Sequence, residues 1–405
     1  MQAGYERVYA EIDLNRIRQN LLSVGERLST GMSGRRQQFI CVVKADAYGH
    51  GAPAIARFIE EECAEDPVQP DRLTGTVPVW GFAVATAEEA IELRLSGIRK
   101  PILMLGFVPE SRYPEMIEYG IRIPLFEKDH LKAFEEAASK MQKTGYYHIA
   151  VDTGMSRIGL TPDENGLAIV QSAKDYTHIV AEGLFTHLAT ADMEDNAHSF
   201  DQIRKFHDFA ALLDENGIRI PLKHYANSAA TVYEMYRNDS DLCRLGISLY
   251  GLPASEAIRE ETPAVQPALS LYSQVIYVTD VPAGTRVGYG EIFVTDKPSR
   301  IATVSIGYAD GYPRGLSGKA DVLIYGKRCP VVGRVCMDLI MVDVTALGLG
   351  DQNPVKECDT VTLIGQDGDE VITINELASL ADRFYYELPC LLSKRVPRIY
   401  VKKVK

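Results

Sequence analysis

The sequence predicts an α/β fold: an N-terminal (β/α)8 barrel of the TIM type, followed by a mostly β C-terminal domain. Three observations support this prediction. Short β-rich runs alternate with amphipathic helical stretches from Gln38 to Gly251, the alternation gives eight strand–helix units, and consecutive strands replace it after about Pro253. Repeated strand–helix units form parallel sheets, and eight of them in one segment favour a closed barrel.

The eight strand candidates are short runs rich in apolar and β-branched residues. In chain order they are Phe39–Val43, Val79–Val84, Ile102–Leu105, Ile121–Phe126, Tyr147–Val151, Ile179–Phe185, Leu222–Ala226 and Cys243–Leu249. Apolar residues recur at helical spacing between them, as in TAEEAIELRLSG, which ends at Gly97. Gly120, Gly145 and Gly217 also lie where helices should stop. An open doubly wound sheet is the alternative, although no GxGxxG motif follows the first strand.

The C-terminal part predicts consecutive strands with little helix. Its alternating runs are LYSQVIYVTDV, RIATVSIGYADG, ADVLIYGKRCPVVGRVCMDLIMVDVT and DTVTLIG, and one helical stretch, Asn375–Arg383, interrupts them. The resulting division is residues 1–12 as a strand that packs with the C-terminal domain, 13–255 as the barrel, and 256–405 as the β domain. The Pro-rich insert Cys63–Pro78 predicts a surface loop.

Composition excludes several classes of function. The formal net charge of −12 argues against nucleic acid as a partner, and the basic run Lys394–Lys405 alternates with apolar residues like an edge strand. The seven cysteines never form a CxxC pair, so we expect no metal site, no disulfide framework and a reducing compartment. We find no signal-peptide core and no apolar stretch of about 18 residues, which predicts a soluble cytoplasmic protein.

Lys44 is the first candidate for chemistry, because it directly follows the apolar strand FICVV. Burial at the mouth of a barrel disfavours the charged amine and eases formation of a Schiff base. A lysine that extends its amine to solvent from a strand end is the simpler interpretation. The sequence KADAYGHG that begins at Lys44 changes the balance, because its glycines allow a tight turn and Tyr48 lies close enough to help hold a phosphate.

The other predicted strand ends add polar groups at the same mouth. These are Arg157 in DTGMSRIG, His187 in FTHLATAD, Asn227 and Ser228 in HYANSAAT, and Arg244, Gly246 and Ile247 in CRLGISLYG. Barrels commonly bind phosphate with the loops after strands seven and eight. Each group has a simpler interpretation, since His187 could be an ordinary core or surface histidine and Ser228 an N-cap. Their convergence on one rim favours a ligand site.

Nine motifs together resemble the alanine racemase family of enzymes that use pyridoxal phosphate (PLP). In order they are VVKADAYGHG, DTGMSRIG, FTHLATAD, HYANSAAT, RLGISLYG, VGYGE, GYADGYPR, GRVCMD and LSKRVPR. The resemblance covers nearly the whole chain. It implies PLP as cofactor, a homodimer of barrel-plus-β-domain subunits in which the partner's β domain completes each active site, and a small amino acid as substrate.

The resemblance also implies roles for individual residues. Lys44 would be the Schiff-base lysine and one base, and Tyr289 in VGYGE the opposite base, contributed by the other subunit. Binding roles follow for the remaining matches: Tyr48, Ser228, Gly246, Ile247 and Tyr386 for the phosphate, Arg244 and His187 for the pyridine ring, Arg157 and the partner's Met337 for the substrate carboxylate, and Asp192, Tyr308, Arg314 and Arg334 for the corridor through which substrate enters.

These roles agree with the chemistry of racemisation. A proton must leave Cα on one face and return on the other, which requires two bases. An arginine at the pyridine nitrogen keeps that nitrogen unprotonated, because guanidinium does not readily give up a proton. We expect this weaker electron sink to limit side reactions such as transamination. Considered alone, Tyr289 is one of 21 tyrosines, and a packing role in the β domain is the preferred interpretation.

One position departs from the family pattern. Many members have a carbamylated lysine seven residues before the position of Arg157, where it helps to orient that arginine. Here the residue is Ala150, which carries no charge. Either another anion takes this place or Arg157 is held differently.

The alternatives are a serine or broad-specificity racemase of the same family, a PLP-carrying regulatory protein, and a PLP decarboxylase. The bulky Tyr386 beside the substrate side chain favours the methyl group of alanine, although pocket size discriminates only modestly. The regulatory proteins lack a β domain, and the motifs match racemases rather than decarboxylases. The sequence therefore favours an alanine racemase that supplies D-alanine for peptidoglycan synthesis.

Overall fold

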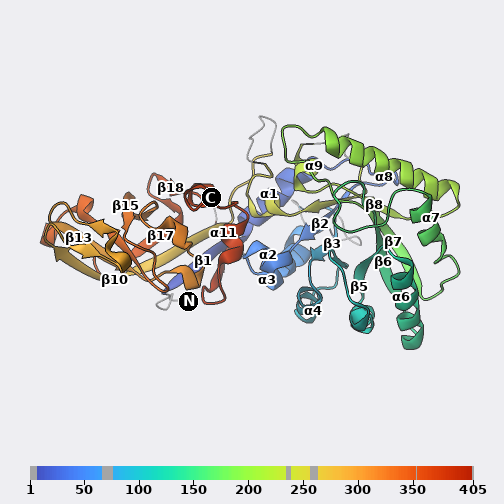
Figure 1. The fold of residues 1–405 in the computed structure, drawn as a ribbon, viewed down its shortest axis with the longest axis horizontal. Helices are drawn as coiled ribbons and strands as arrows, with labels where there is room; N and C mark the ends of the chain where they lie inside the picture. Colours follow the sequence, from blue (N-terminus) through green and yellow to red (C-terminus); the bar gives the residue numbers. More distant parts are fainter. Residues whose placement is uncertain (1–6, 66–75, 234–238, 256–262, 353, 404–405) are drawn as a thin grey trace. The chain divides into compact units, whose positions relative to one another are not determined.

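A computed structural model describes residues 7–65, 76–233, 239–255, 263–352 and 354–403 (Figure 1). The chain divides into two compact units. The first comprises residues 16–47 and 51–266, and the second comprises residues 1–15, 48–50 and 267–405. Most of the predicted insert, residues 66–75, lies outside the described residues, as do the first six residues and the predicted domain boundary after residue 255.

The first unit contains an eight-stranded parallel sheet with the order β8-β7-β6-β5-β4-β3-β2-β9. The strands are β2 Gln38–Val42, β3 Val79–Val84, β4 Ile102–Met104, β5 Ile121–Leu125, β6 Gly145–Ala150, β7 Ile179–Phe185, β8 Leu222–His224 and β9 Leu242–Leu245. Two backbone hydrogen bonds join the segments of β8 and β9, the outer strands of this order. Asp241 N–H donates to Lys223 O at 2.7 Å, and Arg244 N–H donates to Ala226 O at 3.0 Å. The sheet therefore closes, which confirms the predicted (β/α)8 barrel.

Helices surround these strands (Figure 1). They are α1 Leu14–Gly25, α3 Ala52–Phe58, α4 Ala87–Leu95, α5 Tyr113–Glu118, α6 Lys128–Met141, α7 Glu164–Gln171, α8 Ala197–Glu215 and the short α9 Ser228–Val232. Each long helix buries one stripe of side chains along its length. In α6 the buried residues are Leu131, Phe134 and Ala138, at intervals of three and four residues. That spacing places all three on the face that packs against the barrel.

Two details of the predicted barrel were wrong. Gly145 does not end a helix, because α6 already stops at Met141 with Gln142 in the left-handed region. Gly145 instead begins β6, where a Cβ would lie 2.7 Å from the Phe134 ring. The eighth predicted strand also ends early, since the chain turns at Gly246 into a single-turn helix, η4 Ile247–Tyr250.

The second unit is mostly β, as predicted. Its nine-stranded sheet has the order β18-β17-β14-β15-β16-β13-β10-β1-β19. The strands are β1 Val8–Asp13, β10 Leu269–Val281, β13 Ser299–Val304, β14 Asp321–Ile324, β15 Lys327–Val332, β16 Ile340–Asp343, β17 Thr360–Asp367, β18 Glu370–Ile372 and β19 Arg398–Val401, with a separate hairpin of β11 Arg286–Val287 and β12 Phe293–Val294 and the helices α10 Ile374–Leu380 and α11 Glu387–Leu391.

The two ends of the chain lie side by side in this sheet. β1 pairs antiparallel with β10 and parallel with β19, for example Ile12 with Leu269 and with Tyr400. β19 is the last strand of the order, so Arg398–Val401 of the basic run forms an edge strand. Charged side chains suit an edge because they discourage further strand pairing.

Candidate active site

Lys44 follows β2 and begins a turn with unusual backbone geometry. Its segment, α2 Lys44–Tyr48, has φ values between 51° and 55° at Ala45, Asp46 and Ala47, and Tyr48 has φ 51°. Left-handed conformation costs roughly 1–2 kcal/mol for each non-glycine residue, so neighbouring groups must hold this turn in place. The Asp46 carboxylate contributes by accepting a hydrogen bond from Ala52 N–H, 2.8 Å.

Glu89 is a second support for the Lys44 turn that the sequence did not reveal. Its carboxylate accepts hydrogen bonds from Ala45 N–H at 2.6 Å and Ala85 N–H at 2.8 Å, and also from Thr86 N–H. The Thr86 side chain accepts from Glu89 N–H in return, which is a capping box at the start of α4. One carboxylate therefore joins the end of β3 to the residue that follows Lys44.

Arg244 on β9 is buried, with 3% exposure, and its terminal nitrogens are fully engaged. Nη1 donates to Nδ1 of His224 at 2.7 Å and Nη2 donates to Thr186 O at 2.7 Å. Nη2 also lies 3.3 Å from Nδ1 of His187. None of these bonds uses Nε. Burial lowers the pKa of Arg244 to about 9, so the guanidinium stays protonated at neutral pH and can donate from Nε.

His187 follows β7 and lies among the positively charged side chains of the barrel mouth. Burial lowers the pKa of His187 well below its usual value, and the charges of Arg244, Arg157 and Lys44 lower it further. The structure therefore brings together the four residues that the sequence assigned to the ring, the substrate carboxylate and the Schiff base. Three cations around a neutral imidazole suit an anionic ligand.

The loops after β8 and β9 are joined by a direct hydrogen bond. Asn227 caps α9 by accepting from Ala230 N–H at 3.0 Å, and Ser228 Oγ accepts from Gly246 N–H at 2.9 Å. The next residue, Ile247, is buried. The three residues predicted to bind a phosphate from this unit, Ser228, Gly246 and Ile247, are thus neighbours in the structure.

Arg157 lies near Ala150, where the family pattern has a lysine. A pocket of about 20 Å³ is lined by Ala150, Asp152 and Arg157 together with Phe185 and His187. Such a volume has room for one water molecule. Arg157 itself is exposed.

The candidate residues of the second unit form two groups. Tyr48 and Tyr386 belong to the first group. Gly49, the residue after Tyr48, packs so closely against α11 that a Cβ would lie 1.9 Å from the Pro389 carbonyl oxygen. Tyr386 directly precedes α11. The predicted phosphate-binding tyrosines thus come from neighbouring segments.

Asp192, in the first unit, is exposed, and its backbone oxygen accepts from Ser255 Oγ at 2.6 Å.

Most of the second group is exposed, and Arg334 is partly buried. Tyr289 lies in a turn, η5 Tyr289–Glu291, with 73% exposure, and Met337 has 52%. A Cβ on Gly290 would lie 3.1 Å from Nε of Arg334, so the arginine adjoins the Tyr289 turn. Tyr308 N–H donates to Cys336 O at 3.0 Å, which ties the Tyr308 turn to the Met337 loop. Arg314, in η7 Arg314–Leu316, is exposed as well.

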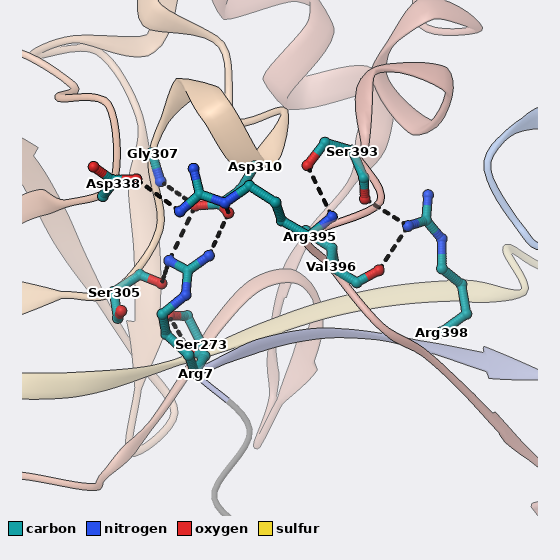
Figure 2. Close-up of polar contacts among 10 residues, drawn as sticks. All are labelled: Arg7, Ser273, Ser305, Gly307, Asp310, Asp338, Ser393, Arg395, Val396 and Arg398. Carbon is teal, nitrogen blue, oxygen red and sulfur yellow. Dashed lines mark hydrogen bonds and ion pairs between the residues drawn. The ribbon is translucent and has the colours of Figure 1, made fainter.

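A buried carboxylate holds the Tyr308 turn (Figure 2). Asp310 has no exposed surface, and Arg7 forms an ion pair with it. Asp310 also accepts from Gly307 N–H at 3.0 Å, and Arg395 reaches both Asp310, 3.5 Å, and Asp338, 2.7 Å. This cluster fixes the turn that carries Tyr308 to the loop that carries Met337.

We expect Asp310→Asn to lower the free energy of unfolding by about 3 kcal/mol, because it leaves Arg7 without its anionic partner. The value lies at the low end for a buried pair, since the Arg7 side chain is 30% exposed. Urea denaturation measures the change. Asp338→Asn is the matched control: Asp338 is half exposed, and its loss should cost less than about 1 kcal/mol. Equal losses of stability in the two variants would contradict the greater stabilising role of the buried Asp310.

Buried histidines predict that stability falls in acid. Burial lowers the pKa of His148 on β6, of His187 and of His224 on β8 below the ordinary value of 6.5. The unfolded chain binds these protons first, so each histidine removes up to about 1.4 kcal/mol per pH unit as the pH falls below about 6.5. Urea denaturation at pH 7 and pH 5.5 should show a loss of about 3 kcal/mol.

The matched control for this pH effect is His178→Gln, because His178 is partly exposed and pairs with Glu135 at 2.9 Å. That variant should keep the steep dependence on pH. A wild-type stability that is the same at both pH values would show that the three buried imidazoles do not govern it.

Comparison with known proteins covers both units. Residues 12–66 and 74–254 match the family described as "Alanine racemase, N-terminal domain", and residues 268–400 match "Alanine racemase, C-terminal domain". An alanine racemase of Methanococcus maripaludis is 40% identical over 394 residues, which cover 97% of this chain and 98% of the relative. Among solved structures, alanine racemase from Bacillus anthracis with bound L-Ala-P has a TM-score of 0.87 at 33% identity, covering 100% of this chain and 97% of that one.

A histidine racemase from Leuconostoc mesenteroides is also similar, with a TM-score of 0.85 at 28% identity and 99% of each chain covered. The barrel, the charged cluster at its mouth and these matches define the protein as a racemase, a class of isomerase. The chain belongs to the alanine racemase family.

Proposed function

We propose that the protein is a PLP-dependent alanine racemase that interconverts L-alanine and D-alanine with two bases. One observation supports this most strongly: Lys44, Arg157, His187 and Arg244 converge at one barrel mouth in a chain that matches the family over both domains. D-Alanine for peptidoglycan synthesis is the proposed product, and the cytoplasm the proposed compartment. In the described part of the chain, no helix is long and apolar enough to cross a membrane.

The residues present fit PLP, judged by the chemistry of their donors. An aromatic aldehyde with a phosphate needs an amine, a donor for its ring nitrogen and donors for its phosphate. Lys44 offers the amine, Nε of buried Arg244 the ring donor, and the joined loops with Ser228, Gly246 and Ile247 the phosphate donors. Tyr48 and Tyr386 would add phenol groups to the phosphate site.

When bound, PLP supplies a conjugated ring that takes up the electrons of the substrate's Cα–H bond. The side chains do the rest. The Lys44 amine moves the proton at Cα on one face, and the phenol oxygen of Tyr289 of the partner subunit moves it on the other. Arg157, with the partner's Met337, holds the substrate carboxylate. Arg244 holds the ring nitrogen without protonating it, because its charged form persists at neutral pH.

Exposure supports the homodimer in this proposal. Tyr289, Met337 and Tyr308 are large side chains with 73%, 52% and 44% exposure in the single chain, and Ile292 and Val294, which follow Tyr289 in the sequence, are about half exposed. Contiguous exposed apolar groups mark interaction surfaces. In a dimer that covers this surface, Tyr289 of each subunit would enter the active site of the other subunit. Asp192, Tyr308, Arg314 and Arg334 would then line the substrate corridor.

The test of the function is a racemisation assay with the PLP-saturated protein. Circular dichroism follows L-alanine, L-serine and L-histidine under the same conditions. We expect kcat/KM for alanine to exceed that for serine by at least about tenfold, because Tyr386 leaves little room beyond a methyl group. Faster turnover of serine would favour the broad-specificity alternative, and faster turnover of histidine would favour an activity like that of the Leuconostoc relative.

A further inference from the structure

A line of polar side chains leads away from Arg244 through the barrel interior. Five successive strands contribute one residue each: Arg122 on β5, His148 on β6, Glu182 on β7, His224 on β8 and Arg244 on β9. Arg122 Nε donates to Glu182 Oε2 at 2.8 Å, and Glu182 Oε2 lies 3.4 Å from Nε2 of His148. Nδ1 of His148 lies 2.8 Å from Nε2 of His224, and Nδ1 of His224 lies 2.7 Å from Nη1 of Arg244.

Arg244 and Glu182 determine the position of every proton between them. A guanidinium only donates and a carboxylate only accepts. Nδ1 of His224 must therefore accept from Arg244, so the His224 proton lies on Nε2 and points to Nδ1 of His148. The His148 proton then lies on its own Nε2 and points to Glu182. Both imidazoles are neutral, and the hydrogen bonds between Arg244 and Glu182 all run from the arginine towards the carboxylate.

Packing holds the two rings where this order requires them. Both histidines have no exposed surface. The Phe185 ring stacks on His224 with centroids 5.2 Å apart and planes within 7°. A Cβ on Gly183 would lie 2.3 Å from Nδ1 of His148, so only glycine admits that ring. Burial pushes the pKa of Glu182 upward, but hydrogen bonds from His148 and Arg122 outweigh it and lower the pKa to about 2.

We propose that Glu182 is a positioning residue for Arg244, acting through His148 and His224. Its charge fixes the tautomer of both histidines, and Nδ1 of His224 thereby always presents a lone pair to the guanidinium. The statement that Arg244 in turn faces the ring nitrogen of PLP rests on the proposed function. The proton order itself does not.

The order is tested first without cofactor or mutation. Long-range ¹⁵N–¹H spectra of protein labelled with ¹⁵N-histidine report the tautomer and charge of each ring, and His148→Gln and His224→Gln assign the signals. We expect both rings to be neutral, with the proton on Nε2. An imidazolium, or a proton on Nδ1 of either ring, would overturn the proposal whether or not the protein racemises alanine.

Glu182→Gln then tests the role of the charge. Arg122 only donates, so the glutamine carbonyl turns to Arg122 and the amide NH₂ turns to His148. The proton of each histidine then moves from Nε2 to Nδ1. Nδ1–H of His224 and Nη1–H of Arg244, both donors, would then face each other. We expect the spectra to show the reversal, PLP binding to weaken, and kcat to fall about tenfold with KM for alanine within twofold, as when a group that orients a ligand-binding side chain is lost.

Two further variants separate positioning from general damage. Glu135→Gln disturbs a different Glu–His pair of this unit, with His178, and should change neither kcat nor the His148 and His224 signals. Arg122→Leu with Glu182→Gln frees the amide oxygen to face His148, and should restore the tautomers and most of kcat. A double variant no better than Glu182→Gln, or a reversal of tautomers with unchanged kcat and PLP binding, would refute the role of Glu182.

Discussion

Lys44→Ala should lower the racemisation rate by a factor of at least about 10⁴, because the change removes both the amine that would carry PLP and one of the two proposed bases. The protein should still fold, since Lys44 begins a turn that backbone hydrogen bonds to Glu89 and Asp46 hold. The measurement combines the alanine assay with mass spectrometry after borohydride treatment of the PLP-loaded protein. Wild type should carry a pyridoxyl group on Lys44.

The matched control is Lys143→Ala, which removes a surface lysine of the same unit that pairs with Glu118 at 2.6 Å. Its rate and its pyridoxyl label should equal those of wild type. A label on another lysine of the wild-type protein, or undiminished racemisation by Lys44→Ala, would contradict the role of Lys44.

Tyr289→Phe should be the second large effect. It removes one oxygen atom from a side chain with 73% exposure, so the free energy of unfolding should not change measurably. Racemisation should fall by about 10² to 10⁴, the usual contribution of a positioned acid or base. Lys44 remains, so NMR in D₂O should still show exchange of the α-proton of D-alanine without inversion.

Tyr325→Phe is the control for this substitution. Tyr325 is also an exposed tyrosine of the β unit, with 51% exposure and a hydrogen bond to Asp359, and its loss should leave racemisation unchanged. Inversion by Tyr289→Phe at the wild-type rate would show that this phenol is not the second base.

The barrel could be predicted because its signals are local. Each strand is a short apolar run and each long helix has a 3.6-residue apolar stripe, so their order follows from the sequence. The ends of elements depend on packing instead. Gly145 resembled a helix stop, yet it begins β6 because Phe134 fills the space that a Cβ would need.

The site was predictable to the same extent. Lys44, His187 and Arg244 lie at strand ends and Arg157 in the loop after β6, each inside a recognisable motif, and barrel closure brings strand ends together. Glu182 and His148 had one weak signal, a polar residue inside an apolar strand. Their partners could not be predicted, because one residue from each of five strands meets only once the register is known. Asp310 likewise required residues about 300 positions apart to meet.

We propose that each active site takes Lys44 from one subunit and Tyr289 from the other. Mixing the Lys44→Ala and Tyr289→Phe proteins, dissociating them and letting them reassociate tests it directly. In a symmetric dimer, half of the reassociated molecules are mixed, and each of these has one site with both intact residues. We expect recovery of about a quarter of wild-type activity from two inactive proteins. Activity that stays at the sum of the two single variants would contradict it.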